Sequence, residues 1–187
     1  SLSRAVNLSG FWTMKKFSAL ALLAPAVIDA QSQPTFPAQY SCASMYTLNG
    51  SKYGQVTHID QTNQETAVQK IASSLVSFFA NKTKYSISTS WCSPLTIYGT
   101  FATDPPMSAA YQYIGSETVG GVECDKFGED DQYADHIVYF KKGTWTPVQV
   151  YDKQQEQTGM LGGLTHYSNC VEGKNATAYD VPASCFN

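Results

Sequence analysis

The chain has 187 residues, of which 43% are hydrophobic and 14% are charged, and its formal net charge is −3. This length suits one domain with a hydrophobic core. The acidic balance argues against nucleic acid and anionic membrane surfaces as partners, because both favour a basic stripe.

The N-terminal stretch has the pattern of a secretory signal peptide. Met14 is followed by two lysines, an apolar run over residues 17–28 and then Ala30-Gln31-Ser32, which places small residues at the expected cleavage site. This pattern predicts a signal peptide over residues 14–30, cleaved after Ala30 or Ser32. The apolar run is too short to span a bilayer.

Residues 1–13 precede the signal pattern and are interpreted as an upstream extension that is not native. Residues 31–187 then form a single β domain with a net charge near −5. We therefore expect a secreted protein, with the lysosome or another endomembrane lumen as the other compartments that fit.

Between residues 40 and 91 the sequence predicts consecutive β-hairpins. Asn49-Gly50 is a strong hairpin turn, and further turns fall at residues 61–63 and 81–83. Residues 67–79 also have apolar positions three and four apart, so an amphipathic helix is the alternative there. Strands are favoured because their neighbours are strands, and the expected strands are Tyr40–Leu48, Tyr53–Asp60, Thr66–Ile71, Leu75–Phe79 and Tyr85–Trp91.

After Cys92 the prolines and glycines predict a connecting loop. Residues 111–152 then read as four strands joined by tight turns, rich in β-branched and aromatic residues. Pro147 lacks a backbone donor, so its strand should begin there or lie at an edge. Residues 154–163 are expected to hold one short helix, and residues 166–187 to be pinned by cysteines instead of long strands.

Five cysteines follow the signal pattern, and no pair is close enough in sequence for a zinc knuckle or a redox motif. Disulfides that close long loops are expected, with one cysteine left over and the connectivity open. These residues are Cys42, Cys92, Cys124, Cys170 and Cys185. Three sequons, at Asn49, Asn81 and Asn175, fall in expected turns and predict a glycoprotein.

Several motifs together resemble the ependymin-related family. They are Tyr113–Glu117 before a Val-Gly-Gly turn, Asp125–Phe127, Thr146–Val148, Ile59–Gln64, Cys92 with Pro94-Leu95, and the closing segment from His166–Asn169 through Asp180–Pro182 to Cys185. Each motif is weak alone, but together they cover nearly all of residues 31–187.

The resemblance implies an all-β, mainly antiparallel fold of two stacked curved sheets, or a half-open barrel, enclosing a hydrophobic pocket, with one or two short helices. It also implies hydrophobic-ligand binding, calcium, contact with matrix components and homodimers. Trp145 stands where the family usually has the cysteine that partners Cys42, so Cys124 is the candidate replacement. The bridge carried over from the family joins Cys92 to Cys170 or Cys185.

The principal hypothesis is that a fatty acid or lipid binds in this pocket without catalysis. Taken singly, each of the candidate lining residues is more typical of ordinary core than of a ligand contact. They are Phe78, Phe101, Tyr111, Tyr113, Phe127, Val138, Phe140, Trp145, Val148 and Val150.

The alternative is a calcium-dependent matrix or adhesion protein that acts through its surface. Its candidate calcium ligands are Glu129, Asp130, Asp131 and Asp135, although a solvated turn explains the same residues and the spacing is not that of an EF-hand. An enzyme is not expected, because none of the three histidines lies in a nucleophile signature.

Overall fold

The computed structural model describes residues 31–48, 50–129, 136–152 and 163–186. Nearly all regular structure in these residues is β, and they contain no helix that could span a membrane. Two short 3-10 helices, η1 and η2, follow the last strand. The bounds are β1 Gln39–Leu48, β2 Ser51–Asp60, β3 Glu65–Gln69, β4 Ser73–Phe78, β5 Thr83–Ser88, β6 Cys92–Thr96, β7 Gln112–Val119, β8 Val122–Gly128, β9 His136–Lys141, β10 Pro147–Asp152, β11 Leu164–Glu172, η1 Ala176–Tyr179 and η2 Ala183–Phe186.

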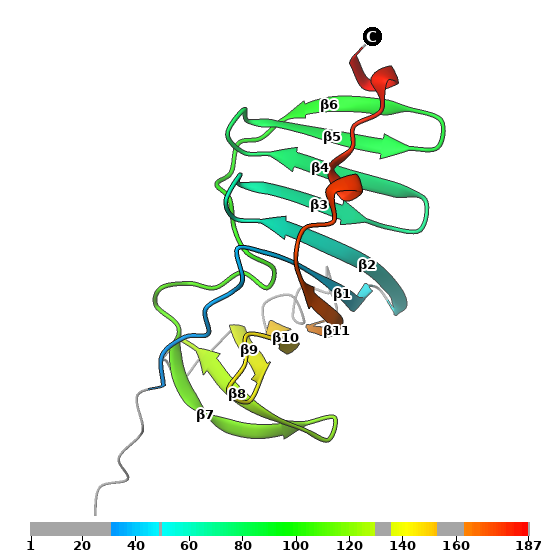
Figure 1. The fold of residues 1–187 in the computed structure, drawn as a ribbon. Helices are drawn as coiled ribbons and strands as arrows, with labels where there is room; N and C mark the ends of the chain where they lie inside the picture. Colours follow the sequence, from blue (N-terminus) through cyan, green and yellow to red (C-terminus); the bar gives the residue numbers. More distant parts are fainter. Residues whose placement is uncertain (1–30, 49, 130–135, 153–162, 187) are drawn as a thin grey trace, which may run out of the picture.

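The strands form one antiparallel sheet in the order β6-β5-β4-β3-β2-β1-β11-β10-β9-β8-β7. This confirms the all-β, mainly antiparallel class; of the two forms expected, one continuous, strongly curved sheet agrees with the half-open barrel and not with two stacked sheets (Figure 1). The reason is β11, which pairs with β1 on one side and β10 on the other. The prediction that the tail lacks long strands was therefore wrong.

The predicted hairpins are confirmed. β1 and β2 pair directly as far as Leu48 and Ser51, on either side of the predicted turn, and Gly50 has the positive φ of 77° that favours glycine. Residues 65–78 form β3 and β4, so the helical alternative is excluded. The expected loop after Cys92 begins later, because residues 92–96 first form the edge strand β6.

The four strands predicted within residues 111–152 are β7 to β10, and β10 begins at Pro147 as expected. A register shift between Pro147 and Gln149 interrupts the pairing with β9. Pro147, which has no backbone N–H to donate, therefore lies where the strand pairing is interrupted. The strand itself lies inside the sheet and not at its edge.

The two faces of the sheet have different covers. Asp60 and Ile59 are adjacent on β2 and therefore point to opposite faces. We call the Asp60 face the tail face, because residues 173–186 run across it over β3 to β6 (Figure 1). We call the Ile59 face the loop face, because residues 31–38 and 97–111 pack on it.

Each cover buries its own core. On the tail face, Ala67 and Val76 pack with Ala178 and Tyr179. On the loop face, two adjoining clusters meet at Phe36 and Tyr167. One cluster contains Tyr40, Cys42 and Ile59. The other contains Phe127, Val138, Phe140 and Val150.

The disulfides join Cys42 to Cys170 and Cys92 to Cys185, and Cys124 is a buried free thiol. The first bridge corrects the expectation that Cys124 partners Cys42. Cys42 and Cys170 lie on the adjacent strands β1 and β11, whose Cα atoms are 4.1 Å apart at the bridge. The second bridge selects Cys185 from the two partners considered for Cys92.

Some predictions fall on residues outside the described ranges. These are the upstream extension and signal peptide within residues 1–30, the sequon Asn49, three of the proposed calcium ligands and the helix expected within residues 154–163.

Candidate functional site

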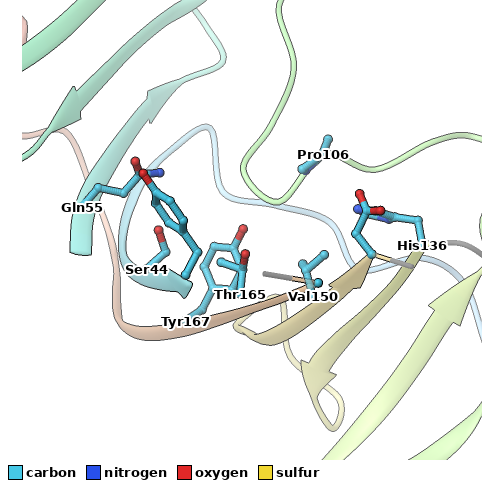
Figure 2. Close-up of a pocket in the computed structure, with 10 residues that line it drawn as sticks. Ser44, Gln55, Pro106, His136, Val150, Thr165 and Tyr167 are labelled. Atoms are coloured by element: carbon cyan, nitrogen blue, oxygen red, sulfur yellow. The ribbon is translucent and has the colours of Figure 1, made fainter. Parts of the chain in front are cut away.

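A cavity of about 290 Å³ lies on the loop face, between the middle of the sheet and the 97–111 segment (Figure 2). Side chains from five strands form its floor, and Pro106 lies across from them on the loop. The lining residues are Ser44, Tyr46, Gln55, Pro106, His136, Val150, Asp152, Gly163, Thr165 and Tyr167.

Antiparallel register brings most of these side chains to one face. Ser44 lies opposite Gln55 on β2 and Tyr167 on β11, while Tyr46 lies opposite Thr165. Thr165 in turn lies opposite Val150 on β10. Since directly paired residues share a face, these residues form one continuous floor.

Two tyrosines, the buried Tyr40 and the half-buried Tyr167, hold the loop over this floor by way of Asp104. The Tyr167 hydroxyl donates to Asp104 Oδ1 at 2.7 Å, and the Tyr40 hydroxyl donates to the Asp104 carbonyl at 3.3 Å and accepts its backbone N–H at 3.1 Å. Burial, and then the charge of Asp104, raises the pKa of Tyr167 well above its ordinary value. Both phenols therefore remain protonated donors, and they fix Asp104 two residues before Pro106.

One end of the cavity is polar. The Tyr111 hydroxyl and His136 Nδ1 lie 2.6 Å apart, and Asp152 faces His136 across the β9–β10 pair. Burial lowers the pKa of His136 against the opposing charges of Asp152 and Glu129, and burial followed by the same charges raises the pKa of Tyr111. The hydroxyl therefore donates and the neutral imidazole accepts.

The ten pocket candidates do not converge on this cavity. Val150 lines it; Phe127, Val138 and Phe140 are buried beside it in the core. Tyr111 and Tyr113 pack against that core, Phe101 and Trp145 against the neighbouring cluster, Phe78 against the tail-face cluster, and Val148 is half-buried.

Sequence reasoning missed most of the lining because it selected large apolar residues. The floor is instead an alternation of small polar and aromatic residues, as in Ser44 and Tyr46 on β1. That alternation was visible in the sequence, but the pairing of β1 with β11, which completes the floor, joins segments more than a hundred residues apart.

The described residues contain no group of three or more His, Cys, Asp or Glu side chains placed to hold a metal ion. Glu129 is exposed, and the other three proposed calcium ligands lie outside the described ranges. Asn81 and Asn175 are exposed, which is compatible with glycans at both.

The fold and cavity define a class: an all-β protein with one curved antiparallel sheet and a small cavity beneath a loop. No family model and no curated protein matches the chain. Among solved structures, an uncharacterised conserved protein from Thermus thermophilus is 9% identical with a TM-score of 0.56, over 80% of this chain and 89% of that one.

Two further structures are more distant. The Pseudomonas aeruginosa MucA/MucB complex gives 11% identity and a TM-score of 0.43 over 79% of this chain and 56% of that one. A DUF1329 family protein from Desulfovibrio piger gives 14% identity and a TM-score of 0.30 over 77% and 90%. The Thermus protein thus shows the fold, and the other two scores are too low to extend the likeness.

Proposed function

We propose that this chain is a secreted, non-catalytic binding protein for a fatty acid or a similarly slender hydrophobic molecule. The observation that carries the proposal is the loop-face cavity, whose apolar surface comes from Tyr46, Val150, Tyr167 and Pro106 and whose far end is polar. An amphipathic molecule needs this combination, because its chain seeks apolar walls and its head group needs hydrogen bonds.

The volume limits the ligand. Ligand sites commonly enclose about 300–1,000 Å³, so a cavity of about 290 Å³ is at the small end and favours a single chain over a two-chain phospholipid. Each methylene buried contributes roughly 0.8 kcal/mol, so about ten must be buried to supply the roughly 8 kcal/mol of micromolar affinity, and more are needed once binding costs are subtracted.

The polar end supports binding over catalysis. Among the described residues, the hydrogen-bond partner of His136 is a phenol and not a serine hydroxyl or a thiol that it could activate. The neighbouring Asp152 disfavours a second carboxylate at close range, so a fatty acid would enter with its head group away from Asp152 or protonated.

Secretion is supported by the signal pattern and by two disulfides, which persist in oxidising compartments. Intact mass of the protein from a eukaryotic host, before and after glycan removal, tests both cleavage and modification. We expect loss of residues 1–30 and glycans on Asn81 and Asn175.

The decisive test fills the cavity. Thr165 lies on the floor, so Thr165→Phe should weaken binding of cis-parinaric acid by at least tenfold, on the order of 1.4 kcal/mol. Thr118→Phe, on an exposed position of β7, is the matched control and should bind like the parent. A folded Thr165→Phe protein with undiminished binding would overturn the proposal.

The alternative, a surface-acting adhesion protein, is favoured by one feature of the tail face. Met45, 50% exposed, and Ile71, fully exposed, line a shallow groove of about 420 Å³. Exposed apolar surface of this kind suits a partner such as a matrix component or a second copy. Light scattering with and without calcium tests it: a calcium-dependent increase in mass would favour this alternative.

A further inference from the structure

A second cavity, of about 620 Å³, lies between residues 31–35 and the turn that joins β9 to β10. None of its lining residues also lines the loop-face cavity. Its walls include the aromatic side chains Phe127 and Trp145, and the carboxyl group of Asp125 opens into it from β8.

Asp125 is only 2% exposed, yet the donors that reach it are neutral. The Gln31 side-chain amide and the Gly143 N–H each donate to Oδ2 at 2.8 Å, and the Ser116 hydroxyl donates to Oδ1 at 3.4 Å. Hydrogen bonds of this kind offset part of the cost of burying a carboxylate, but a cation offsets more.

The nearby lysines are engaged elsewhere. Lys126 forms an ion pair with Glu117, and Lys142 forms one with Glu123. Within the described residues, none of the ion pairs includes Asp125. Among the described residues, the buried carboxylate thus has no cation as an ion-pair partner, and the charge of Lys142 acts on it only at longer range.

Gln31 is also the residue that signal cleavage after Ala30 would place at the new N terminus. We propose that the cavity captures this terminus: the α-ammonium group released by cleavage pairs with Asp125, whose carboxylate already holds the Gln31 side chain. The occupant is thus a segment of the chain itself, and the missing cation is supplied only in the processed protein.

The chemistry of the two forms explains why processing matters. Before cleavage, the Gln31 nitrogen is an uncharged amide and adds nothing to the charge balance of Asp125. After cleavage it is an amine with an ordinary pKa of about 7.7–8.0, and a neighbouring carboxylate raises that pKa. The stabilisation is then fully present below about pH 7.7 and is lost as the pH rises through the raised value.

Capture should also protect the terminus from cyclisation. An N-terminal glutamine forms a lactam when its free amine attacks the side-chain amide carbon; the new C–N bond replaces the bond to Nε2, which leaves as ammonia. An ammonium held by Asp125 has no lone pair for this attack, and Nε2 is engaged by the same carboxylate. Gln31 in the captured terminus should therefore keep its side-chain amide and not form the lactam.

The inference depends on cleavage after Ala30, which it shares with the proposal of secretion, and not on the loop-face cavity, so it fails separately from the proposal of ligand binding. The first measurement is the intact mass of the secreted protein. We expect a chain that begins with unmodified Gln31; a chain that begins at Gln33, or a lactam at residue 31, would overturn the inference.

The second measurement compares two melting temperatures. One is that of the processed chain, which begins at Gln31, and the other is that of a chain that retains residues 27–30. At pH 6 the processed chain should melt about 2–4 °C higher, and the difference should vanish near pH 10. Asp125→Asn should abolish the difference, whereas Glu123→Gln, an exposed carboxylate, should preserve it. Equal melting temperatures at pH 6 would overturn the inference even if Asp125→Asn fails to fold.

Discussion

The two covers of the sheet are attached in different ways. Residues 173–186 cover the tail face through small side chains and Tyr179, and the Cys92–Cys185 disulfide ties them to the edge strand β6. The loop-face cover, residues 31–38 and 97–111, is held by aromatic packing around Phe36 and by hydrogen bonds to Asp104. The tail cover therefore combines a covalent bond with a small core, whereas the loop cover depends on large aromatic rings, and the loop-face cavity lies beside these rings.

The largest effect is expected in the aromatic core of the loop face. Phe140 is fully buried and packs against Phe36 and Phe127, so Phe140→Ala should cost about 3–5 kcal/mol of unfolding free energy. Tyr98→Ala, at a position that is 96% exposed, is the control and should change stability by less than about 0.5 kcal/mol. Urea denaturation measures both; a small loss for Phe140→Ala would mean that the loop cover does not depend on its rings.

The tail cover should respond to loss of its disulfide. Cys92 and Cys185 are 93 residues apart, and replacing both with alanine should cost about 2–4 kcal/mol. Because the rest of the sheet keeps its strand pairing, limited proteolysis of the variant should cut first within residues 173–186. First cuts in residues 97–111 would show that the loop cover is the weaker one.

The sequence predicted strands joined by short turns far better than the strand β11, whose partners are distant in the sequence. Strands joined by short turns, such as β1 and β2 at Asn49-Gly50, are encoded by local alternation and turn chemistry. β11 was missed because its neighbours β1 and β10 are set by long-range pairing, and β11 itself is mostly exposed and carries a cysteine that suggested a pinned coil.

The residues predicted to line a pocket are not, with the exception of Val150, the residues that line the loop-face cavity. Large apolar residues such as Phe127 and Phe140 were chosen for the pocket, and burial made them core. The cavity is lined where side chains are too small to fill the space beneath the loop, as at Ser44 and Thr165, and sequence cannot show such space without the pairing of β1 with β11.

An ion pair gives the tail cover a pH dependence. Asp60 is fully buried and accepts from Lys174 at 2.7 Å and from Asn63 at 2.8 Å. Burial alone would raise the pKa of Asp60, but these hydrogen bonds outweigh it and lower the pKa to about 2.

Because the folded pKa of Asp60 is depressed, its contribution is present above the unfolded value of about 3.9 and is lost as the pH falls toward 2. The expected loss is about 2 kcal/mol. Urea denaturation between pH 5 and pH 2 should show it, and Asp60→Asn should flatten that part of the profile. If the stability of Asp60→Asn falls between pH 5 and pH 2 as steeply as that of the parent, the acid sensitivity arises outside the tail cover.

The smallest effect is expected at Cys124, which belongs to neither disulfide and is fully buried on β8. Burial raises the pKa of its thiol, so the reactive thiolate is scarce and access to it is blocked. Cys124→Ala should cost about 1 kcal/mol, and the folded parent should take up no iodoacetamide until it is unfolded, when one thiol per chain reacts. Rapid labelling of the folded protein would mean that β8 opens readily, and since β8 carries Phe127 and Asp125, the loop cover would then be the mobile part of the molecule.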